Sequence, residues 1–481
     1  MPRIVFAKPV ALRCIIRLAV AGQVFVTLGA LGWFNAWTAA VAVVLLVLFR
    51  APLPAARRAL FAAAAIAPFF LLALYPPHAF DETLYHLPFT EALARSGQIR
   101  FLADVRFPIF PQLHEALCAP LFLAFGDTST HLVALAEMIL LGALVYEWRG
   151  KLAAAITLGS PIVAYLATIT YVDAALALFV AAGAYCLDRE DDAWAGFLFG
   201  TACAVKYHGG YFALAGLAYL LFFRRRGIGR YLLALIAAAA PMYLTIVALT
   251  GNPLFPYFGA TPWNSLTMAR GVSLPTLLWD ITFARDRVGL QPPYSPLFAI
   301  ALIITFVAAF RDRRAAFVAA VCAGFLATML FLPPDSRYLL PLVPLVSVVA
   351  ATVFPLKRNV WAILAIAPAF LYCGYRLRML GPLPLTPPAR EHFLARQFRA
   401  YRALQHRGAG LTWLCGTEQI KYFGDSQVVG DNLGPYAAPP AGTRFIVADT
   451  VRCADVRRFA SGFTRVYADG RGELWQLESP P

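Results

Sequence analysis

The sequence has few charged residues, because Asp, Glu, Lys and Arg together make up only 14% of its 481 positions. A typical soluble domain is about 25% charged, and a disordered chain is more polar still, so both classes are excluded. Hydrophobic residues instead make up 60% of the chain, and its mean hydropathy is +0.66. A water-soluble globule of this size cannot bury so much apolar surface. The composition therefore indicates a polytopic membrane protein.

Acidic residues are scarcer than basic ones: 26 Asp and Glu stand against 41 Lys and Arg, which gives a formal net charge of +15. This excess does not indicate nucleic-acid binding, since most of the basic residues flank apolar runs, as they do in membrane proteins. The sequence also lacks a CxxC pair for structural zinc. Its N-terminal apolar run lacks a small-residue cleavage site, and it therefore predicts a first span.

Apolar runs that approach the roughly 20 residues of a membrane span recur through the first three quarters of the chain. Residues 115–125 are apolar too, and we expect them to lie at the membrane surface or dip into it. The expected fold class is α, a polytopic helical domain over residues 1–375. We predict about thirteen spans, at residues 14–33, 36–49, 59–76, 131–148, 152–170, 173–187, 193–205, 211–223, 231–249, 295–310, 315–332, 338–355 and 359–375.

The distribution of Lys and Arg predicts the orientation of these spans. With a cytoplasmic N-terminus, the inner segments carry 19 of these residues and the outer loops carry 8. Two outer loops are large, residues 77–130 and 250–294, whereas the inner loops are short. This asymmetry favours an enzyme that works at the outer face, because loops carry function on a rigid scaffold.

The tail, residues 376–481, has the pattern of a small extracytoplasmic α/β domain. We expect a basic helix at 389–407, a short helix at 454–461, and strands at 410–415, 444–447, 465–468 and 473–477. The last two strands are separated by an Asp-Gly turn, which is typical of a hairpin. Cys415 ends one strand and Cys453 follows another, so a disulfide is predicted in an oxidising compartment. Two unpaired thiols are the alternative.

The segment with the most chemical information follows the third predicted span. Two adjacent acids, Asp81 and Glu82, precede Tyr85 and His86, and Pro88 starts the next helix. Asp81 is placed to cap a short helix, and Glu82 to face His86 one turn on. An ordinary cap with a solvated first turn is the alternative. Ionisable residues at a membrane boundary beside a large loop favour a functional site.

This segment resembles the first outer loop of the C-type glycosyltransferases (GT-C), which include the protein mannosyltransferases and the aminoarabinose lipid A transferase. The resemblance extends over residues 59–355, although two extra spans precede the family's usual first helix and the tail has no diagnostic motif. Further similar elements follow in the family's order on the same predicted side: Phe110–Glu115, Tyr171–Ala174, Lys206-Tyr207, Gly251–Pro256 and Asp335–Pro341.

The resemblance implies an enzyme of the bacterial inner membrane that moves a sugar from a polyprenyl-phosphate donor to a lipid, glycan or protein acceptor at the extracytoplasmic face. Asp81, with Glu82 beside it, would act as general base on the acceptor hydroxyl, and the anomeric centre would invert. Cations are needed where the leaving phosphate develops charge. The implied substrate-binding residues are Arg337, Lys206, Tyr338, Asp173, Tyr85, His86, His114 and Glu115.

Other interpretations of these residues remain open. Glu82 and His86 are of the types that bind divalent metals, but a lipid-phosphate sugar lacks the pyrophosphate that often requires one, and no cofactor is expected. Lys206 and Arg337 also suit plain headgroup contacts. A transporter or flippase of a lipid-linked glycan is an alternative function, and so is a non-catalytic scaffold. Against transport, the sequence has no internal repeat, and its charges cluster at one membrane face.

The first testable prediction concerns topology. Single cysteines introduced in the 77–130 loop and in the tail should both react with a membrane-impermeant thiol reagent in intact cells or spheroplasts, because the Lys and Arg alternation puts both segments outside. Protection of either position until the cells are lysed would contradict the predicted orientation.

Overall fold

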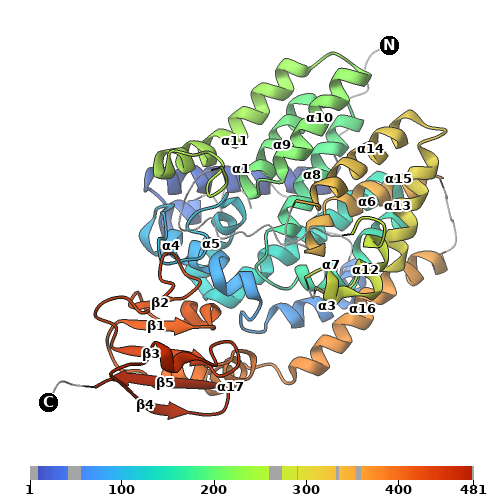
Figure 1. The fold of residues 1–481 in the computed structure, drawn as a ribbon. Helices are drawn as coiled ribbons and strands as arrows, with labels where there is room; N and C mark the ends of the chain where they lie inside the picture. The colour runs from blue at the N-terminus through green and yellow to red at the C-terminus, as the bar shows by residue number, and fades with distance from the viewer. Residues whose placement is uncertain are drawn as a thin grey trace.

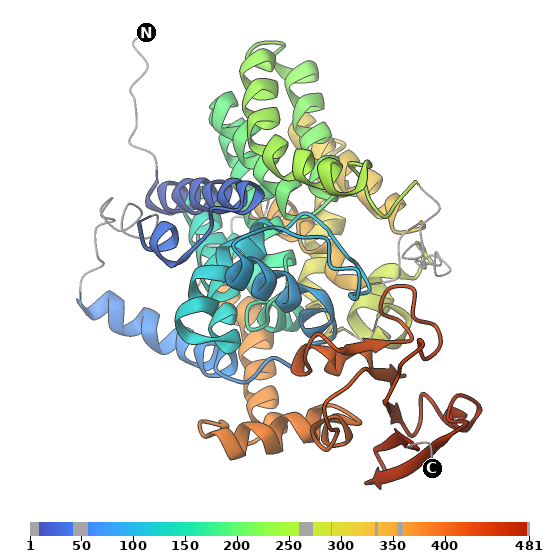
Figure 2. The same cartoon turned by 90° about the vertical axis from the view of Figure 1, so that its left-hand side faces the viewer.

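The computed structural model describes residues 9–41, 56–258, 273–289, 291–331, 335–353 and 359–478. Apolar helices form the bulk of the molecule, and a small sheet lies at one end of it in both views (Figures 1 and 2). The longer helices of the bundle are α1 (Val10–Leu31), α3 (Ala56–Ala73), α5 (Leu113–Phe125), α6 (His131–Leu158), α8 (Asp173–Asp188), α9 (Asp192–Val205), α10 (Gly209–Phe223), α11 (Ile228–Thr250), α13 (Pro296–Ala308), α14 (Arg313–Thr328), α15 (Leu342–Val353) and α16 (Asn359–Leu380).

Short helices and helical turns connect these elements. Most of them lie where the sequence predicts the two large loops, although residues 259–272 of the second loop, and 42–49 of the second predicted span, fall outside the described residues. They are η1 (Glu82–His86), α4 (Leu87–Ser96), η2 (Asp127–Thr130), α7 (Pro161–Leu166), α12 (Leu277–Phe283), η3 (Arg285–Arg287) and η4 (Ser336–Leu339).

Glycine allows two of the helices to pack backbone against backbone. A Cβ atom at Gly196 would lie 2.0 Å from the carbonyl oxygen of Tyr231, and one at Gly200 would lie 2.3 Å from that of Leu235. Small residues four apart produce such close contacts between membrane helices. Helices α9 and α11 therefore form a fixed pair beside the candidate site.

The predicted span at 152–170 is wrong as one helix. Helix α6 kinks at Arg149 and Gly150, where the backbone leaves helical geometry, and then ends at Leu158. Pro161 lacks the N–H that would continue it, and it starts the separate short helix α7 instead. A Cβ atom at Gly159 would meet the carbonyl of Ala365 at 1.8 Å, so this break also lets α16 approach closely.

The count of thirteen spans stays a prediction. Four helices in the described part of the chain are long and apolar enough to cross a membrane by length and composition: Val10–Leu31, Asp127–Leu158, Ile228–Thr250 and Asn359–Leu380. Several others, among them α5, α9, α10, α13 and α15, are apolar but have only 10–17 residues. The bounds of the other observed helices agree with the predicted spans to within a few residues.

The C-terminal domain is a five-stranded sheet with short helices. Its strand order is β2-β1-β3-β5-β4; β1 is parallel to β2 and β3, and the hairpin β4–β5 is antiparallel, as predicted from Asp469-Gly470. Its elements are α17 (Pro387–Gln397), α18 (Tyr401–Gln405), β1 (Thr412–Cys415), η5 (Glu418–Phe423), β2 (Val428–Gly430), β3 (Phe445–Asp449), η6 (Val456–Arg458), β4 (Phe463–Ala468) and β5 (Gly472–Leu477).

Three details of this domain differ from the sequence prediction. The basic helix expected at 389–407 is divided into α17 and α18, because Ala400 adopts a left-handed conformation with φ of 58°. The helix expected at 454–461 is only the turn η6. Strand β2 was not predicted, since three residues are too few to show an alternating pattern.

The C-terminal domain packs against the first loop, residues 77–130. Side chains of Leu84, Tyr85 and Phe89 share an apolar cluster with Phe398 and Ile420 of the domain. Ion pairs reinforce the contact: Lys421 lies 2.6 Å from Asp104, and Arg390 lies 2.6 Å from Asp127. The domain is therefore held next to the acidic segment that the sequence marks as functional.

Surface positions suited to the topology test are present on these segments. Ser96 ends α4 in the first loop, and Ser461 lies in the tail; both are exposed. Glu190, in a turn predicted to be cytoplasmic, is exposed as well and provides the protected control.

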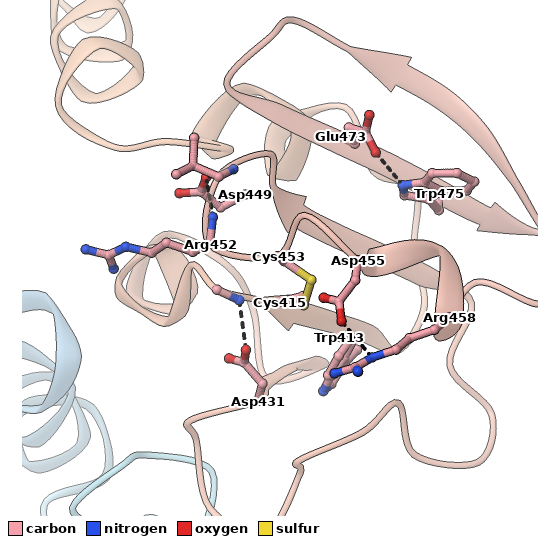
Figure 3. Close-up of a disulfide and its surroundings, with 12 residues drawn as sticks. Trp413, Cys415, Asp431, Asp449, Arg452, Cys453, Asp455, Arg458, Glu473 and Trp475 are labelled. Atoms are coloured by element: carbon pink, nitrogen blue, oxygen red, sulfur yellow. Dashed lines mark hydrogen bonds and ion pairs between the residues drawn. A yellow bond between two sulfur atoms is a disulfide. The ribbon is translucent and has the colours of Figure 1, made fainter.

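A disulfide joins Cys415 and Cys453, as predicted, with their Cα atoms 5.7 Å apart (Figure 3). The bridge links the end of β1 to the turn after β3, and it lies in a small core with Trp413, Val429 and Ile446. The six other cysteines, all within the described residues, form no disulfide.

Removing this bridge should destabilise the C-terminal domain. Closing a chain of 38 residues stabilises a fold by about 3–4 kcal/mol, since it restricts the unfolded state. The double variant Cys415→Ser/Cys453→Ser should therefore become sensitive to limited proteolysis within the tail, at temperatures where wild type resists. Peptide mapping without reductant is the direct measurement, and recovery of both cysteine peptides as free thiols from wild type would contradict the bridge.

Candidate functional site

Glu82 fixes the start of the first loop. Its Oε1 accepts hydrogen bonds from His131 Nε2 (2.6 Å) and the backbone N–H of Thr170 (2.7 Å), and its Oε2 accepts from the N–H groups of His78 and Ala79 (2.9 and 3.0 Å). Both oxygens are thus occupied, and the side chain is fully buried. Glu82 is consequently tied to α6 and to the turn before α8.

Asp81, the preceding residue, has a different environment. Its Oδ2 accepts from the hydroxyl of Tyr85 (3.1 Å) and from Arg337 Nη2, while its backbone N–H donates to the hydroxyl of Tyr171 (3.0 Å). Asp81 makes no side-chain cap to the turn η1, so its predicted role as a helix cap is wrong. The backbone at Asp81 is helical, which turns its carboxylate sideways toward Arg337 instead.

Arg337 gathers three carboxylates around one guanidinium group. Besides Asp81, its Nε lies 2.9 Å from Asp335 Oδ2 and 3.9 Å from Asp173 Oδ2. The guanidinium carbon also lies 4.6 Å from the ring centre of Tyr171, a cation–π contact. Arg337 is 6% exposed, so these contacts replace nearly all of its hydration.

Lys206 supplies a second cation from the turn that ends α9. Its Nζ lies 2.8 Å from Asp173 Oδ1 and 4.5 Å from the ring centre of Tyr338. Asp173 therefore bridges the two cations. We call Asp81, Asp173, Lys206, Asp335 and Arg337 the charged cluster.

Two carboxylates of the charged cluster have pKa values shifted in opposite directions. Burial raises the pKa of Asp335 above its usual value, although Arg337 opposes the shift. Burial also disfavours the ionised form of Asp81, but Arg337 and then His86 outweigh it and lower its pKa. Arg337 thus favours the ionised form of Asp81, whereas burial keeps the pKa of Asp335 above its usual value.

Two histidines of the first loop, His86 and His114, form separate buried pairs with glutamates. His86 Nδ1 lies 2.6 Å from Glu115 Oε1, and the ring of His86 packs against those of Tyr85 and Tyr171. His114 instead faces Glu137 of α6 at 3.0 Å, inside the bundle. The expected pairing of Glu82 with His86 is therefore wrong, because His131 takes the place of His86. The described residues contain no group of three or more His, Cys, Asp and Glu side chains placed to hold a metal ion.

Most of the residues predicted for the site are brought together. Asp81, Asp173, Lys206 and Arg337 are linked by ion pairs, and Tyr85 and Tyr338 contact them directly. The ring of His86 contacts the rings of Tyr85 and Tyr171, and Glu115 pairs with His86. Glu82 and His114 face away from the charged cluster and hold neighbouring elements together.

Sequence reasoning assigned no role to four residues near the site. Asp335 and Tyr171 stand within two of the motifs, beside Arg337 and Asp173, so proximity in sequence was a usable signal. His131 and His208 carry no such signal: one begins a long apolar helix, and the other follows a Lys-Tyr pair in a short turn.

Two hollows lie outside the charged cluster. A cavity of about 400 Å³ lies between α8, α10, α14 and α15, with Arg149, Asp188 and Arg314 among its polar lining. A groove of about 690 Å³ lies between the first loop and η5, lined by Glu91, Asp127 and Tyr422 among others. No residue of the charged cluster lines either hollow.

A bundle of apolar helices, an acidic first loop and a small α/β domain packed on that loop together form a GT-C-like fold. Two solved structures have this fold. The crystal structure of ArnT from Cupriavidus metallidurans in the apo state matches with a TM-score of 0.56 and 15% identity, over 87% of this chain and 97% of that one. The structure of the same ArnT bound to undecaprenyl phosphate matches with a TM-score of 0.54 and 16% identity, over 88% and 98%.

No family model and no curated protein sequence matches the chain. The similarity therefore establishes the fold, and it confirms at that level the GT-C resemblance predicted from the motifs. The chain is accordingly a multi-pass helical membrane protein.

Glu82 should stabilise the fold in a pH-dependent way. Burial alone would raise its pKa, but His131 outweighs this effect and lowers the pKa from 4.5 to about 2. A lowered pKa stabilises the folded state above the unfolded value, and this contribution is lost as the pH falls from about 4.5 toward 2. Glu82→Gln, which leaves His131 without its carboxylate, should cost about 3–5 kcal/mol at pH 7.

Thermal unfolding of the purified protein in detergent, measured between pH 7 and pH 3, tests this expectation. The gap between wild type and Glu82→Gln should be constant down to about pH 5 and shrink below it. Glu91→Gln is the matched control, since Glu91 forms a partly exposed pair with Arg95 on α4. Equal melting temperatures of Glu82→Gln and wild type at pH 7 would show that the carboxylate is dispensable.

Proposed function

We propose that the protein is a membrane glycosyltransferase that moves a sugar from a polyprenyl-phosphate donor to an acceptor hydroxyl at the extracytoplasmic face of a bacterial inner membrane. The observation that carries the proposal is the charged cluster, in which the carboxylate of Asp81 directly contacts the guanidinium of Arg337. The carboxylate can take the proton of the acceptor hydroxyl, and the guanidinium can bind the leaving phosphate. The ArnT structure with undecaprenyl phosphate bound supports this class of donor.

The donor phosphate is bound by Arg337 and Lys206 in this proposal. Arginine presents a planar pair of N–H groups that match two phosphate oxygens, and lysine adds a point charge. In the structure both cations are held by carboxylates, Asp81 and Asp173. An incoming phosphate competes with Asp81 for Arg337. Because Arg337 is what lowers the pKa of Asp81, this competition makes the carboxylate a better base as the donor binds.

The reaction then follows as an inverting displacement. The acceptor oxygen forms a bond to the anomeric carbon while the bond from that carbon to the phosphate oxygen breaks, and Asp81 takes the hydroxyl proton. The electron pair of the broken bond remains on the polyprenyl phosphate, where Arg337 and Lys206 stabilise it. Tyr85 holds the carboxylate of Asp81 through its hydroxyl and thereby orients the base. Glu82 has no free oxygen for this chemistry, and its role is to position Asp81.

Replacing Asp81 by Asn should abolish transfer without unfolding the protein, because the amide keeps the size of the side chain but cannot take the proton. Loss of a general base costs on the order of 10²–10⁴ in rate. The measurement is lipid and glycan mass spectrometry of a strain that lacks the gene, complemented with wild type or Asp81→Asn. Wild type should restore one missing hexose, pentose or amino sugar, and Asp81→Asn should not.

The matched control is Asp455→Asn, which removes a carboxylate from an exposed pair with Arg458 in the C-terminal domain. It should restore the sugar as wild type does. Restoration by Asp81→Asn at comparable protein levels would remove Asp81 from the mechanism and favour a non-catalytic scaffold.

A further inference from the structure

His208 lies next to the charged cluster, in the turn between α9 and α10. Its ring packs on the ring of Tyr338, with the ring centres 5.1 Å apart and an angle of 30° between the planes. The ring centre of Phe325, in α14, lies 6.1 Å from that of His208. Lys206, two residues earlier, lies over the same Tyr338 ring. His208 is therefore located between the cations and an apolar helix.

Both ring nitrogens of His208 are buried, and neither has a hydrogen-bond partner in the described part of the chain. Buried polar atoms are nearly always paired, so an imidazole with two unpaired nitrogens indicates a missing polar partner. In the neighbouring charged cluster, Asp173 Oδ2 and Arg337 Nε are buried and make no aligned hydrogen bond to any described residue, although both take part in ion pairs. His208, Lys206 and Arg337 all contact the ring of Tyr338, so the unpaired imidazole lies beside both cations.

The ring of His208 is neutral at physiological pH. Burial lowers its pKa, Lys206 and Arg337 lower it further although Asp173 opposes them, and the result is about 3. A neutral imidazole carries one N–H donor and one acceptor nitrogen. It can therefore donate a hydrogen bond to an anion without adding a positive charge of its own.

We propose that His208 donates a hydrogen bond to a phosphate oxygen of the bound polyprenyl phosphate, at the junction between the phosphate and its lipid chain. The placement supports this role, since His208 packs on the same Tyr338 ring that Lys206 and Arg337 contact, and its other ring contact is Phe325 of the apolar helix α14. His208 binds the leaving group and transfers no proton. This inference rests on the proposed function, and it adds a residue that the motifs do not contain.

Binding of undecaprenyl phosphate to the purified full-length protein tests the inference without any turnover. His208→Phe keeps a ring against Tyr338 but removes both nitrogens, and it should weaken binding by about 10-fold or more, as expected for a hydrogen bond to a charged group. His208→Gln restores an N–H donor and should recover most of the affinity. The same substitution should also weaken the binding of inorganic phosphate, measured by competition. Binding of undecaprenol, which lacks the phosphate, should not change.

The control variant is His406→Phe, because His406 also stacks on a tyrosine, Tyr467, but lies exposed in the C-terminal domain. It should bind undecaprenyl phosphate as wild type does. Equal affinity of His208→Phe and wild type would overturn the inference and leave the proposed function standing. Failure of His208→Gln to recover affinity, or an equal loss for undecaprenol, would overturn it in favour of ring packing. Failure of wild type to bind undecaprenyl phosphate would overturn both proposals.

Discussion

The burial of the Arg337 guanidinium is the constraint on which the candidate site depends. Removing a cation from water costs several kcal/mol, and this cost is offset only by well-placed opposite charges. Asp81, Asp173 and Asp335 supply them from the first loop, the start of α8 and the turn before η4. Since these segments are far apart in sequence, one buried arginine fixes the relative positions of three parts of the bundle.

Two adjacent acids are used in different ways because of their surroundings. Glu82 points into the bundle, where His131 and three backbone N–H groups occupy its oxygens, and it holds the first loop to the helices. Asp81 points to the other side, where the side chains of Tyr85 and Arg337 bind its carboxylate. In the proposed mechanism, the fixed Glu82 would position the neighbouring base, since a functional group needs support from residues locked by hydrogen bonds.

The C-terminal domain contributes to the same region by packing. Its apolar residues join those of the first loop in one cluster, and Lys421 and Arg390 pair with Asp104 and Asp127 of that loop. The disulfide between Cys415 and Cys453 stabilises the sheet (Figure 3). The turn η5, which follows β1, contacts η1 of the first loop. The domain thus supports the loop that carries Asp81.

Local sequence pattern by itself determined the helical membrane class, most helix positions and the hairpin β4–β5. It left the disulfide open between a bridge and two thiols, and the structure decided for the bridge. The motifs also selected Asp81 and Arg337, which the structure brings into contact. Tertiary structure alone decided the partners. The pairing of Glu82 with His131 joins residues 49 apart, and the contact of Asp81 with Arg337 joins residues 256 apart. No local pattern encodes such contacts, since they depend on how the helices pack.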